Sequence, residues 1–297
     1  MRCFQECQIK KLFGNGLITK MDISVILITY NNYTLKSGCI ETVLLAIQNQ
    51  ICKSFEIIIV DNSSSEADTT KLKNFISSIE CPKIKYISNE VNNISTSRNI
   101  GAKKAQSELL LFLDDDMLLS NPYILQTVIN ASNYSVYGLS AVRLWTKKDW
   151  YVQNKHLINK LLREQNFDEY SRIIASDQPD PQVRKKKNNR HLLRTYIGNF
   201  GFIKKEALIN VGMWNEHIKG YGTEDDLLTF VLYMKFGNPF LMNDIRVYHI
   251  WHEISDNNYV QLENNTKAYK KLLKQYNIRE FHIGRLLYNE KNIIEYY

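Results

Sequence analysis

The sequence lacks both a long apolar run and any closely paired cysteines. A membrane-spanning helix needs about 18 to 20 consecutive apolar residues, and the 297 residues contain no such run. The five cysteines are an odd number and form no C-x-x-C pair, so neither a disulfide framework nor a zinc site is indicated. This pattern is typical of a reducing compartment. We therefore expect a cytoplasmic protein that can lie at the inner face of the membrane.

The N-terminus also lacks the apolar stretch of about 7 to 15 residues that a secretory signal requires. We expect residues 1–21 to be an N-terminal extension that precedes the folded domain. Hydrophobic residues make up 44% of the chain and charged residues 23%. These values exclude a disordered, collagenous or coiled-coil protein.

Basic residues exceed acidic residues, with 38 Lys and Arg against 31 Asp and Glu, a net charge of +7. Such a charge favours an anionic partner, which can be a phosphorylated small molecule, a membrane surface or a nucleic acid. The densest basic run, Arg184–Arg194, lies in a predicted loop over Ser176–Arg194. It is either a solvated loop or a segment that covers a diphosphate or an anionic acceptor.

The first 120 residues alternate between predicted strands and helices. Continuous apolar runs predict strands buried on both faces, at Ile23–Tyr30, Phe55–Val60, Ile84–Ile87 and Leu109–Leu113. Apolar residues at helical spacing predict helices between them, over 40–47, 72–79 and 97–105. This order predicts an α/β fold with a mostly parallel central sheet flanked by helices.

The second half has a weaker pattern. We predict strands at Tyr137–Leu144, Tyr196–Ile203 and Phe240–His249, and helices at Trp150–Tyr170, Thr223–Phe236 and 258–276. Thr223 and Asp226 have the spacing of a capping box at the start of the second of these helices.

Polar residues follow three of the predicted parallel strands, at Thr29–Asn31, Asp61–Ser65 and Asp114–Asp116. Ligands of such sheets bind beyond the carboxyl ends of the strands. Carboxylates there suit Mg²⁺ or Mn²⁺, which proteins often share with substrate phosphates. The alternative is a strand end followed by solvated aspartates in a turn.

Three other motifs carry reactive groups but also have structural interpretations. Gly220–Asp226 places acids at a helix start, where the helix dipole favours them, and one of them could be a general base. His249 and His252 could bind metal or be structural. Ser95–Asn99 could simply begin a helix, with Arg98 at the surface.

Taken in order, these motifs resemble the family 2 glycosyltransferases of the GT-A fold. The resemblance runs through ISVILITYNN, FEIIIVDNSSS, STSRNIGAKKAQSELLLFLDDD, IGNFGFIKKEAL, GYGTEDDL and VYHIWHE. The last block also resembles, more briefly, chondroitin-synthase-like galactosyl- or N-acetylgalactosaminyl-transferases. The family implies a Rossmann-like sheet and a smaller acceptor-side region.

The resemblance also implies roles for individual residues. Those matching donor-binding positions are Thr29, Tyr30, Asp61, Arg98, Asp114 and Asp115. Asp116 and His249 match the ligands of a divalent metal, Mn²⁺ or Mg²⁺, and Asp225 matches the catalytic base. Further candidates are Asn31, Glu224, Trp251 and His252, the last as a rival metal ligand.

The implied reaction is inverting sugar transfer from a nucleotide diphosphate, a UDP-sugar being favoured, to a hydroxyl of a glycan, lipid-linked or protein acceptor. We expect residues 22–255 to form the glycosyltransferase domain, with a nucleotide-binding half at 22–120 and an acceptor half at 121–255. Residues 256–297 would form a C-terminal helical tail. The AT-rich codon usage that the many Asn, Lys and Ile residues suggest favours bacterial surface-polysaccharide assembly.

Three alternatives remain at this stage. A nucleotidyltransferase acting on sugar phosphates would also use strand-end carboxylates, but it usually carries a glycine-rich basic signature that TYNNYTLKSG lacks. A catalytically inactive interaction protein could keep the same fold. A nucleic-acid-binding protein would want aromatic and basic residues interleaved, and we expect no nucleic-acid partner.

Overall fold

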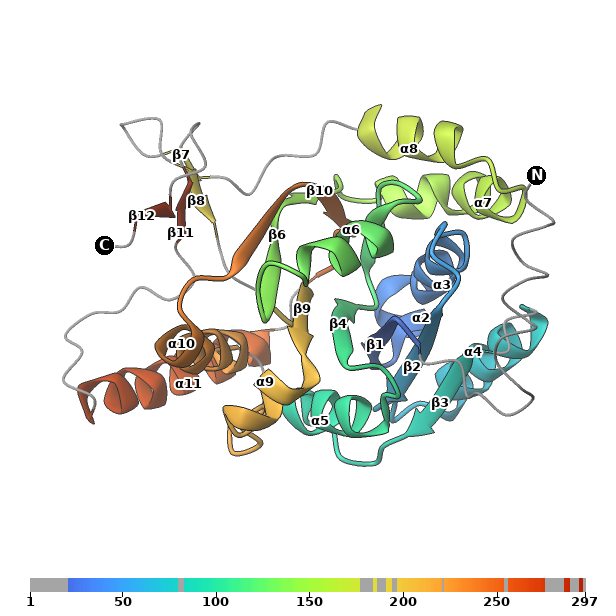
Figure 1. The fold of residues 1–297 in the computed structure, drawn as a ribbon. Helices are drawn as coiled ribbons and strands as arrows, with labels where there is room; N and C mark the ends of the chain where they lie inside the picture. Colours follow the sequence, from blue (N-terminus) through green and yellow to red (C-terminus); the bar gives the residue numbers. More distant parts are fainter. Residues whose placement is uncertain are drawn as a thin grey trace, which may run out of the picture.

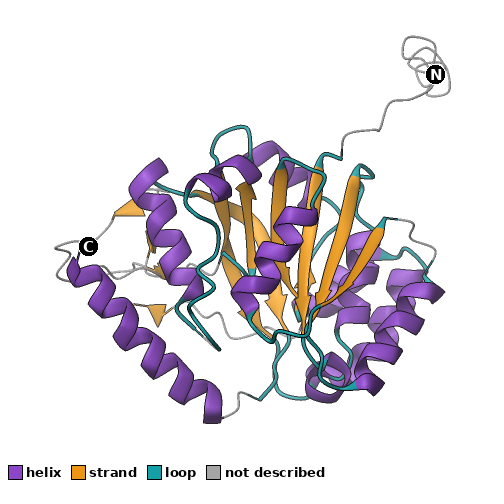
Figure 2. Cartoon of the chain, turned by 90° about the horizontal axis from the view of Figure 1, so that it is seen from below, coloured by secondary structure: helices purple, strands orange, loops and turns teal. Residues whose placement is uncertain are grey.

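An eight-stranded mixed sheet lies at the centre of the protein, with helices on both faces (Figures 1 and 2). The computed structural model describes residues 21–79, 83–176, 184–185, 191–193, 197–220, 222–253, 256–275, 286–288 and 294–295. In spatial order the strands are β3 (Ile84–Ser88), β2 (Phe55–Asp61), β1 (Ile23–Thr29), β4 (Leu109–Asp114), β9 (Phe200–Lys204), β6 (Tyr137–Trp145), β10 (Phe240–His249) and β5 (Met117–Leu119).

Most strands of this sheet run in one direction. β3, β2, β1 and β4 are mutually parallel. β9 is antiparallel to both β4 and β6, so β4 and β6 point the same way, and β10 is parallel to β6. The predicted α/β fold with a mostly parallel sheet is confirmed. The carboxyl ends of β1, β2, β4, β6 and β10 consequently meet at one edge.

Two layers of helices bury the sheet. The helices are α2 (Asn32–Lys36), α3 (Ile40–Gln48), α4 (Glu66–Ser78), α5 (Ile94–Lys104), α6 (Ile124–Ala131), α7 (Trp150–Arg163), α8 (Phe167–Ser176), α9 (Lys205–Asn210), α10 (Glu224–Phe236) and α11 (Asp256–Gln275). Side chains of α3, α4, α6, α7 and α8 share one apolar cluster with the sheet. Side chains of α5, α9 and α10 share a second cluster on the opposite face.

The uninterrupted apolar runs of the first strands follow from this double coverage. Successive side chains of a strand point to opposite faces of the sheet. In β1, Val25 and Leu27 lie in the first cluster and Ile26 lies in the second. Because both faces are buried, every position of such a strand favours an apolar residue.

The later elements depart from the sequence prediction at specific points. The helix predicted over Trp150–Tyr170 is two helices, α7 and α8, because Gln165 between them has a φ of 58°. The strand expected from Tyr196 begins at Phe200. The helix predicted over 258–276 is α11.

The capping-box prediction for α10 was wrong. Thr223 has a φ of 70° and makes no side-chain cap hydrogen bond. Its Oγ1 is buried and has no hydrogen-bond partner among the described residues. The left-handed backbone at this position replaces the extended conformation in which a threonine normally caps a helix.

Some expectations fall mainly outside the described residues. The N-terminal extension does so, as does most of the basic loop at Ser176–Arg194. Within that loop β7 (Arg184–Lys185) and β8 (His191–Leu193) are short strands, and they form a second sheet with β11 (Leu286–Tyr288) and β12 (Ile294–Glu295). Across the described ranges, no helix combines the length and the apolar character needed to span a membrane.

A buried carboxylate ties together the amino-terminal ends of the first strands. Glu56 of β2 is 2% exposed, accepts hydrogen bonds from Ser24 Oγ and Lys85 Nζ, both at 2.6 Å, and from the Gln106 backbone N–H at 2.5 Å. Burial by itself would raise the pKa of Glu56, but these hydrogen bonds lower it below its usual value. The ionised form is therefore the one that stabilises the fold.

We expect Glu56→Gln to lower the free energy of unfolding at pH 7 by roughly 1–3 kcal/mol, because the amide cannot accept all three hydrogen bonds. A lowered pKa contributes stability above the unfolded value of about 4.3, and this contribution is lost as the pH falls further. The difference between variant and wild type should therefore shrink below about pH 4. Urea denaturation at pH 7, 4.5 and 3.5 measures it; a difference independent of pH would contradict the role of the charge.

Candidate active site

The carboxyl edge of the sheet brings together residues that are far apart in the sequence. Thr29 at the end of β1 is in register with Asp61 of β2, and Ile28 is in register with Asp114 of β4. Farther along the same edge, just after β10, the Ile250 backbone N–H donates to the Asp116 carbonyl at 2.9 Å. The aspartates after β4 therefore lie between the loop after β1 and the end of β10.

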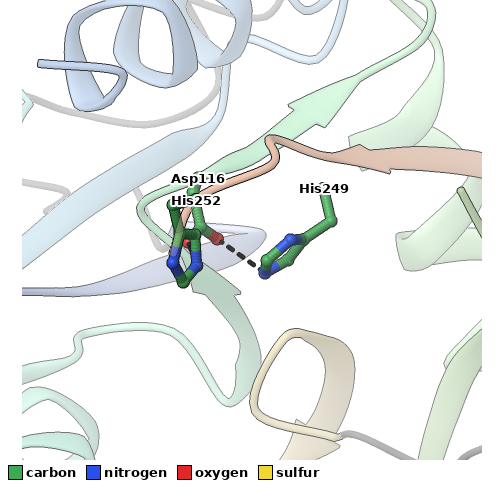
Figure 3. Close-up of side chains that lie close together, drawn as sticks. All are labelled: Asp116, His249 and His252. Carbon is green, nitrogen blue, oxygen red and sulfur yellow. Dashed lines mark ion pairs between the residues drawn. The ribbon is translucent and has the colours of Figure 1, made fainter. Parts of the chain in front are cut away.

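Asp116, His249 and His252 converge on one point (Figure 3). Asp116 Oδ1 is 3.4 Å from His249 Nε2, and Asp116 Oδ2 is 3.2 Å from His252 Nε2. The potential ligand atoms all lie within 4.8 Å of one another. His252 Nδ1 lies 3.1 Å from the Glu253 carbonyl oxygen, which suits an Nδ1–H donor and would direct Nε2 toward a bound cation.

This cluster fits a divalent cation. Asp116 is 1% exposed, and its Oδ1 accepts no hydrogen bond from the described residues. Burial opposes its charge, yet His249, Lys36 and His252 hold the pKa of Asp116 well below its usual range. One ionised carboxylate and two imidazoles are a ligand set for a divalent transition metal such as Mn²⁺. Both histidines that were rival ligands in the sequence lie within reach of the same carboxylate.

Trp145, which the sequence did not single out, packs on the cluster of Asp116, His249 and His252. It ends β6 in register with His249 of β10, and the two rings are 3.9 Å apart between centroids. Its only sequence signal is its position just after the predicted strand Tyr137–Leu144. The ring of Trp251, a further sequence candidate, lies 5.2 Å from Lys148 Nζ.

The middle aspartate, Asp115, is held by groups of the chain itself. Its carboxylate is 2% exposed and accepts hydrogen bonds from Thr29 Oγ1 at 2.7 Å, Asn32 Nδ2 at 2.6 Å and Lys36 Nζ at 2.7 Å. Lys36 Nζ also lies 2.6 Å from Asp116 Oδ2. The side chains of Thr29 and Asp115, both predicted to bind a donor, thus bind each other and anchor α2 to the end of β4.

Arg98 is the centre of a second charged cluster. Its guanidinium lies 3.3 Å from Glu224 Oε1, 3.4 Å from Asp225 Oδ1 and 3.5 Å from Asp114 Oδ1. Its Cζ is 4.3 Å from the centroid of the Trp214 ring, and the residue is 1% exposed. The structure therefore surrounds Arg98 with carboxylates of the chain, and a contact of Arg98 with a donor stays a prediction.

Gly198 completes the packing around this arginine. A Cβ at this position would overlap the guanidinium of Arg98, so any larger residue would displace Arg98 from its carboxylates. The Gly198 backbone N–H donates to Asp225 Oδ1 at 2.9 Å. Burial raises the pKa of Asp114 to about 7, although Arg98 acts in the opposite direction. Asp225 and Asp114, predicted to serve different steps, are thus held by the same cation.

The end of β2 holds Asp61 in a further hydrogen-bond network. Its carboxylate accepts hydrogen bonds from the Ser63 backbone N–H at 2.8 Å, Tyr86 OH at 2.7 Å and Thr69 Oγ1 at 3.2 Å. Burial and the hydrogen bond to Asp61 raise the pKa of Tyr86, so its hydroxyl donates at neutral pH. Tyr86, which the sequence analysis missed, orients the side chain that the resemblance assigns to the nucleotide base.

The loops after β1 and β2 are joined beside Asp61. The Asn31 backbone N–H donates to Ser63 Oγ at 2.9 Å, and Asn31 Nδ2 donates to Ser64 Oγ at 3.1 Å. Tyr30 OH lies 3.3 Å from the same Ser64 hydroxyl. Asn31 has a φ of 42°, a left-handed conformation that asparagine tolerates better than most residues. Tyr30 and Asn31 are therefore joined to the loop that begins at Asp61, and their contact with a donor stays a prediction.

These features define an α/β protein in which the loops after β1 and β2 and the cluster of Asp116, His249 and His252 share one edge of the sheet. Residues 24–212 match the family Glycosyl transferase family 2. The match covers more than half of the chain, and the protein belongs to this family, as the sequence motifs indicated.

Known relatives agree with this assignment. The chain is 25% identical over 234 residues to the uncharacterized glycosyltransferase YfnE of Bacillus subtilis, covering 69% of this chain and 58% of YfnE. It is 26% identical over 254 residues to the GalNAc(5)-diNAcBac-PP-undecaprenol beta-1,3-glucosyltransferase of Campylobacter jejuni, covering 84% of this chain and 70% of that protein. This chain therefore spans less than two thirds of the length of YfnE.

The fold has a counterpart among solved structures. The crystal structure of GalNAc-T7 with UDP, GalNAc and Mn²⁺ is similar, with a TM-score of 0.58 and 17% identity. The similarity covers 85% of this chain and 48% of that one. It shows the GT-A fold, which the sequence resemblance predicted.

If the three-residue cluster binds a cation, His249→Asn and His252→Asn should each weaken Mn²⁺ binding by more than about tenfold, because a lost ligand costs at least as much as a lost outer-shell contact. Titration calorimetry measures the dissociation constant. His156→Asn is the matched control, since His156 is exposed on α7. Wild-type affinity in both cluster variants would show that Mn²⁺ binds elsewhere.

Replacing Arg98 should destabilise the whole fold. Arg98→Met leaves three carboxylates without their shared cation, and breaking a buried ion pair costs about 3–5 kcal/mol. Arg172→Met, which removes an exposed arginine paired with Glu169, should change the free energy of unfolding by less than about 1 kcal/mol. Urea denaturation compares the two variants, and equal losses would mean that the cluster adds nothing to stability.

Proposed function

We propose that this protein is an inverting, metal-dependent glycosyltransferase that transfers a sugar from a nucleotide diphosphate to a hydroxyl of an acceptor. The observation that carries the proposal is the position of the cluster Asp116, His249 and His252 beside the segment after β1, to which Lys36 links Asp116. Membership of glycosyl transferase family 2 supports it. A two-histidine, one-carboxylate set can also hold Fe(II), but the fold and the flanking nucleotide-side loops favour Mn²⁺ or Mg²⁺ beside a diphosphate.

The donor would lie along the carboxyl edge of the sheet. Tyr30, Asn31 and Asp61 surround the point where the base is expected, and Asp114 would lie nearer the ribose. Asp116 with His249 and His252 would hold the metal, which when bound stabilises the negative charge of the leaving diphosphate. Thr29 and Asp115 would act indirectly, since their side chains hydrogen-bond each other.

Asp225 is the proposed general base. It lies in the first turn of α10, is 5% exposed, and its Oδ1 is oriented by the Gly198 backbone N–H. Removing the proton of the acceptor hydroxyl during attack is worth about 10²–10⁴-fold in rate. A single base opposite the leaving group gives direct displacement and inversion at the anomeric carbon. Glu224, whose Oε2 is buried without a hydrogen bond from the described residues, is the second candidate for contact with a sugar hydroxyl.

The proposed substrate classes rest on the C-terminal motif and on the names of similar proteins. A UDP-sugar is favoured by the C-terminal motif and by the UDP named in the GalNAc-T7 structure. The Campylobacter relative is named for a sugar transfer to a lipid-linked glycan, which favours an acceptor of that kind in bacterial surface-polysaccharide assembly. Residues 22–255 would form the catalytic domain, and residues 256–297 a tail that holds α11 together with the short strands β11 and β12, rather than helix alone as the sequence predicted.

A screen of UDP-, GDP- and CDP-sugars for hydrolysis with Mn²⁺ tests this function, because a glycosyltransferase slowly transfers its sugar to water. We expect turnover of one donor class, lost on chelation with EDTA. A nucleotidyltransferase would instead form a nucleotide sugar from a sugar phosphate and a nucleoside triphosphate. An inactive relative would bind a nucleotide without turnover.

The base assignment has its own test. Asp225→Asn should lower the transfer rate by about 10²–10⁴-fold while the dissociation constant for the donor changes little. Asp226→Asn is the matched control, since Asp226 is the next acid in the same first turn of α10. Isothermal titration with the nucleoside diphosphate and a rate assay separate binding from chemistry, and an active Asp225→Asn variant would overturn the assignment.

A further inference from the structure

Lys36 occupies a position for which the sequence offered no role. It ends the five-residue helix α2, which lies between two left-handed residues, Asn31 with a φ of 42° and Ser37 with a φ of 56°. Its Nζ bridges Asp115 Oδ1 at 2.7 Å and Asp116 Oδ2 at 2.6 Å. The side chain is 21% exposed, whereas both carboxylates are 2% exposed. Lys36 thus reaches from the surface onto a buried pair of acids.

The ammonium of Lys36 shares a carboxylate with the metal-binding cluster. Asp116 Oδ2 faces both Lys36 Nζ and His252 Nε2, while Oδ1 faces His249 Nε2. Metal–oxygen distances are about 2.0–2.2 Å for Mg²⁺ and similar ions. A cation on Asp116 Oδ2 would therefore lie within about 5 Å of Lys36 Nζ, and phosphate oxygens bound to that cation would lie within about 7 Å.

Two consequences of opposite sign follow from this distance. Like charges repel at such range in a partly buried site, so Lys36 weakens the binding of a bare divalent cation to Asp116. The same positive charge attracts the diphosphate of a donor, and an ammonium is a common phosphate ligand. Asp115 keeps the ammonium in place through a short hydrogen bond.

We propose that Lys36 is a second cation of the donor-phosphate site. In the absence of a donor it neutralises Asp115 and Asp116, and with a donor bound it contacts the oxygens of the diphosphate. This inference rests on the proposed function, because it needs a nucleoside diphosphate at the carboxyl edge of the sheet. It adds a protein-supplied charge to the charge that the metal supplies.

Lys36→Met tests the inference, because methionine keeps an unbranched side chain and removes the charge. Mn²⁺ alone should bind the variant at least about tenfold more tightly than the wild type. UDP in the presence of EDTA should bind it at least about tenfold more weakly. Lys155→Met is the matched control, since Lys155 Nζ pairs with Glu41 at 3.2 Å and the Ser37 carbonyl at 2.9 Å, away from Asp115 and Asp116.

The opposite signs separate the proposal from a purely structural role. If Lys36 only supported the fold, its replacement would weaken the binding of both Mn²⁺ and UDP. If Lys36 had no role, both dissociation constants would stay unchanged. Either result, or a change in only one of the two ligands, overturns the inference. Titration calorimetry gives both constants, and the melting temperature shows whether each variant is folded.

A second variant covers the case in which Lys36→Met does not fold. Lys36→Gln keeps an amide N–H donor for Asp115 and Asp116 and still removes the positive charge of the ammonium. The same opposite changes in Mn²⁺ and UDP binding are expected. A wild-type protein that binds neither Mn²⁺ nor any nucleoside diphosphate would overturn the proposed function, and with it the role of Lys36.

Discussion

The active edge of this protein depends on compensating buried negative charge. Asp114, Asp115 and Asp116 follow a fully buried strand, and Glu224 and Asp225 begin a helix directed at the same place. Burying ionised carboxylates is costly unless cations or hydrogen-bond donors meet them. Arg98 meets one group of these acids and Lys36 the other. The position of α2 places Lys36 beside these acids, and the position of α5 places Arg98 there.

The two cations divide the edge into regions with different chemistry. Arg98 is buried between Trp214 and carboxylates, and its contacts link α5, β4 and α10. Lys36 is partly exposed and lies beside Asp116 and the two histidines. Arg98 holds Asp225, the proposed base, in position, whereas Lys36 can be reached from the surface. A metal would add its charge on the accessible side only.

Local sequence patterns predicted the first half of the fold better than the second. The strands of β1, β2, β3 and β4 were predicted to within about two residues, because burial on both faces leaves an unbroken apolar run. The break between α7 and α8 and the left-handed start of α10 were missed. Both depend on backbone conformations that ordinary residues adopt only when surrounding contacts hold them. Thr223 illustrates this, since its sequence fits a cap that its φ of 70° prevents.

The sequence alone determined the family, the α/β alternation and the candidate acids and histidines, because periodicity and ordered motifs are local properties of the chain. Only the tertiary structure decided that His249 and His252 both face Asp116, that Thr29 binds Asp115, and that Arg98 holds Asp225. It alone revealed Lys36, Tyr86 and Trp145. Contacts between distant segments follow from strand order and register. No local pattern encodes which side chains the folded sheet will bring within a few ångströms of each other.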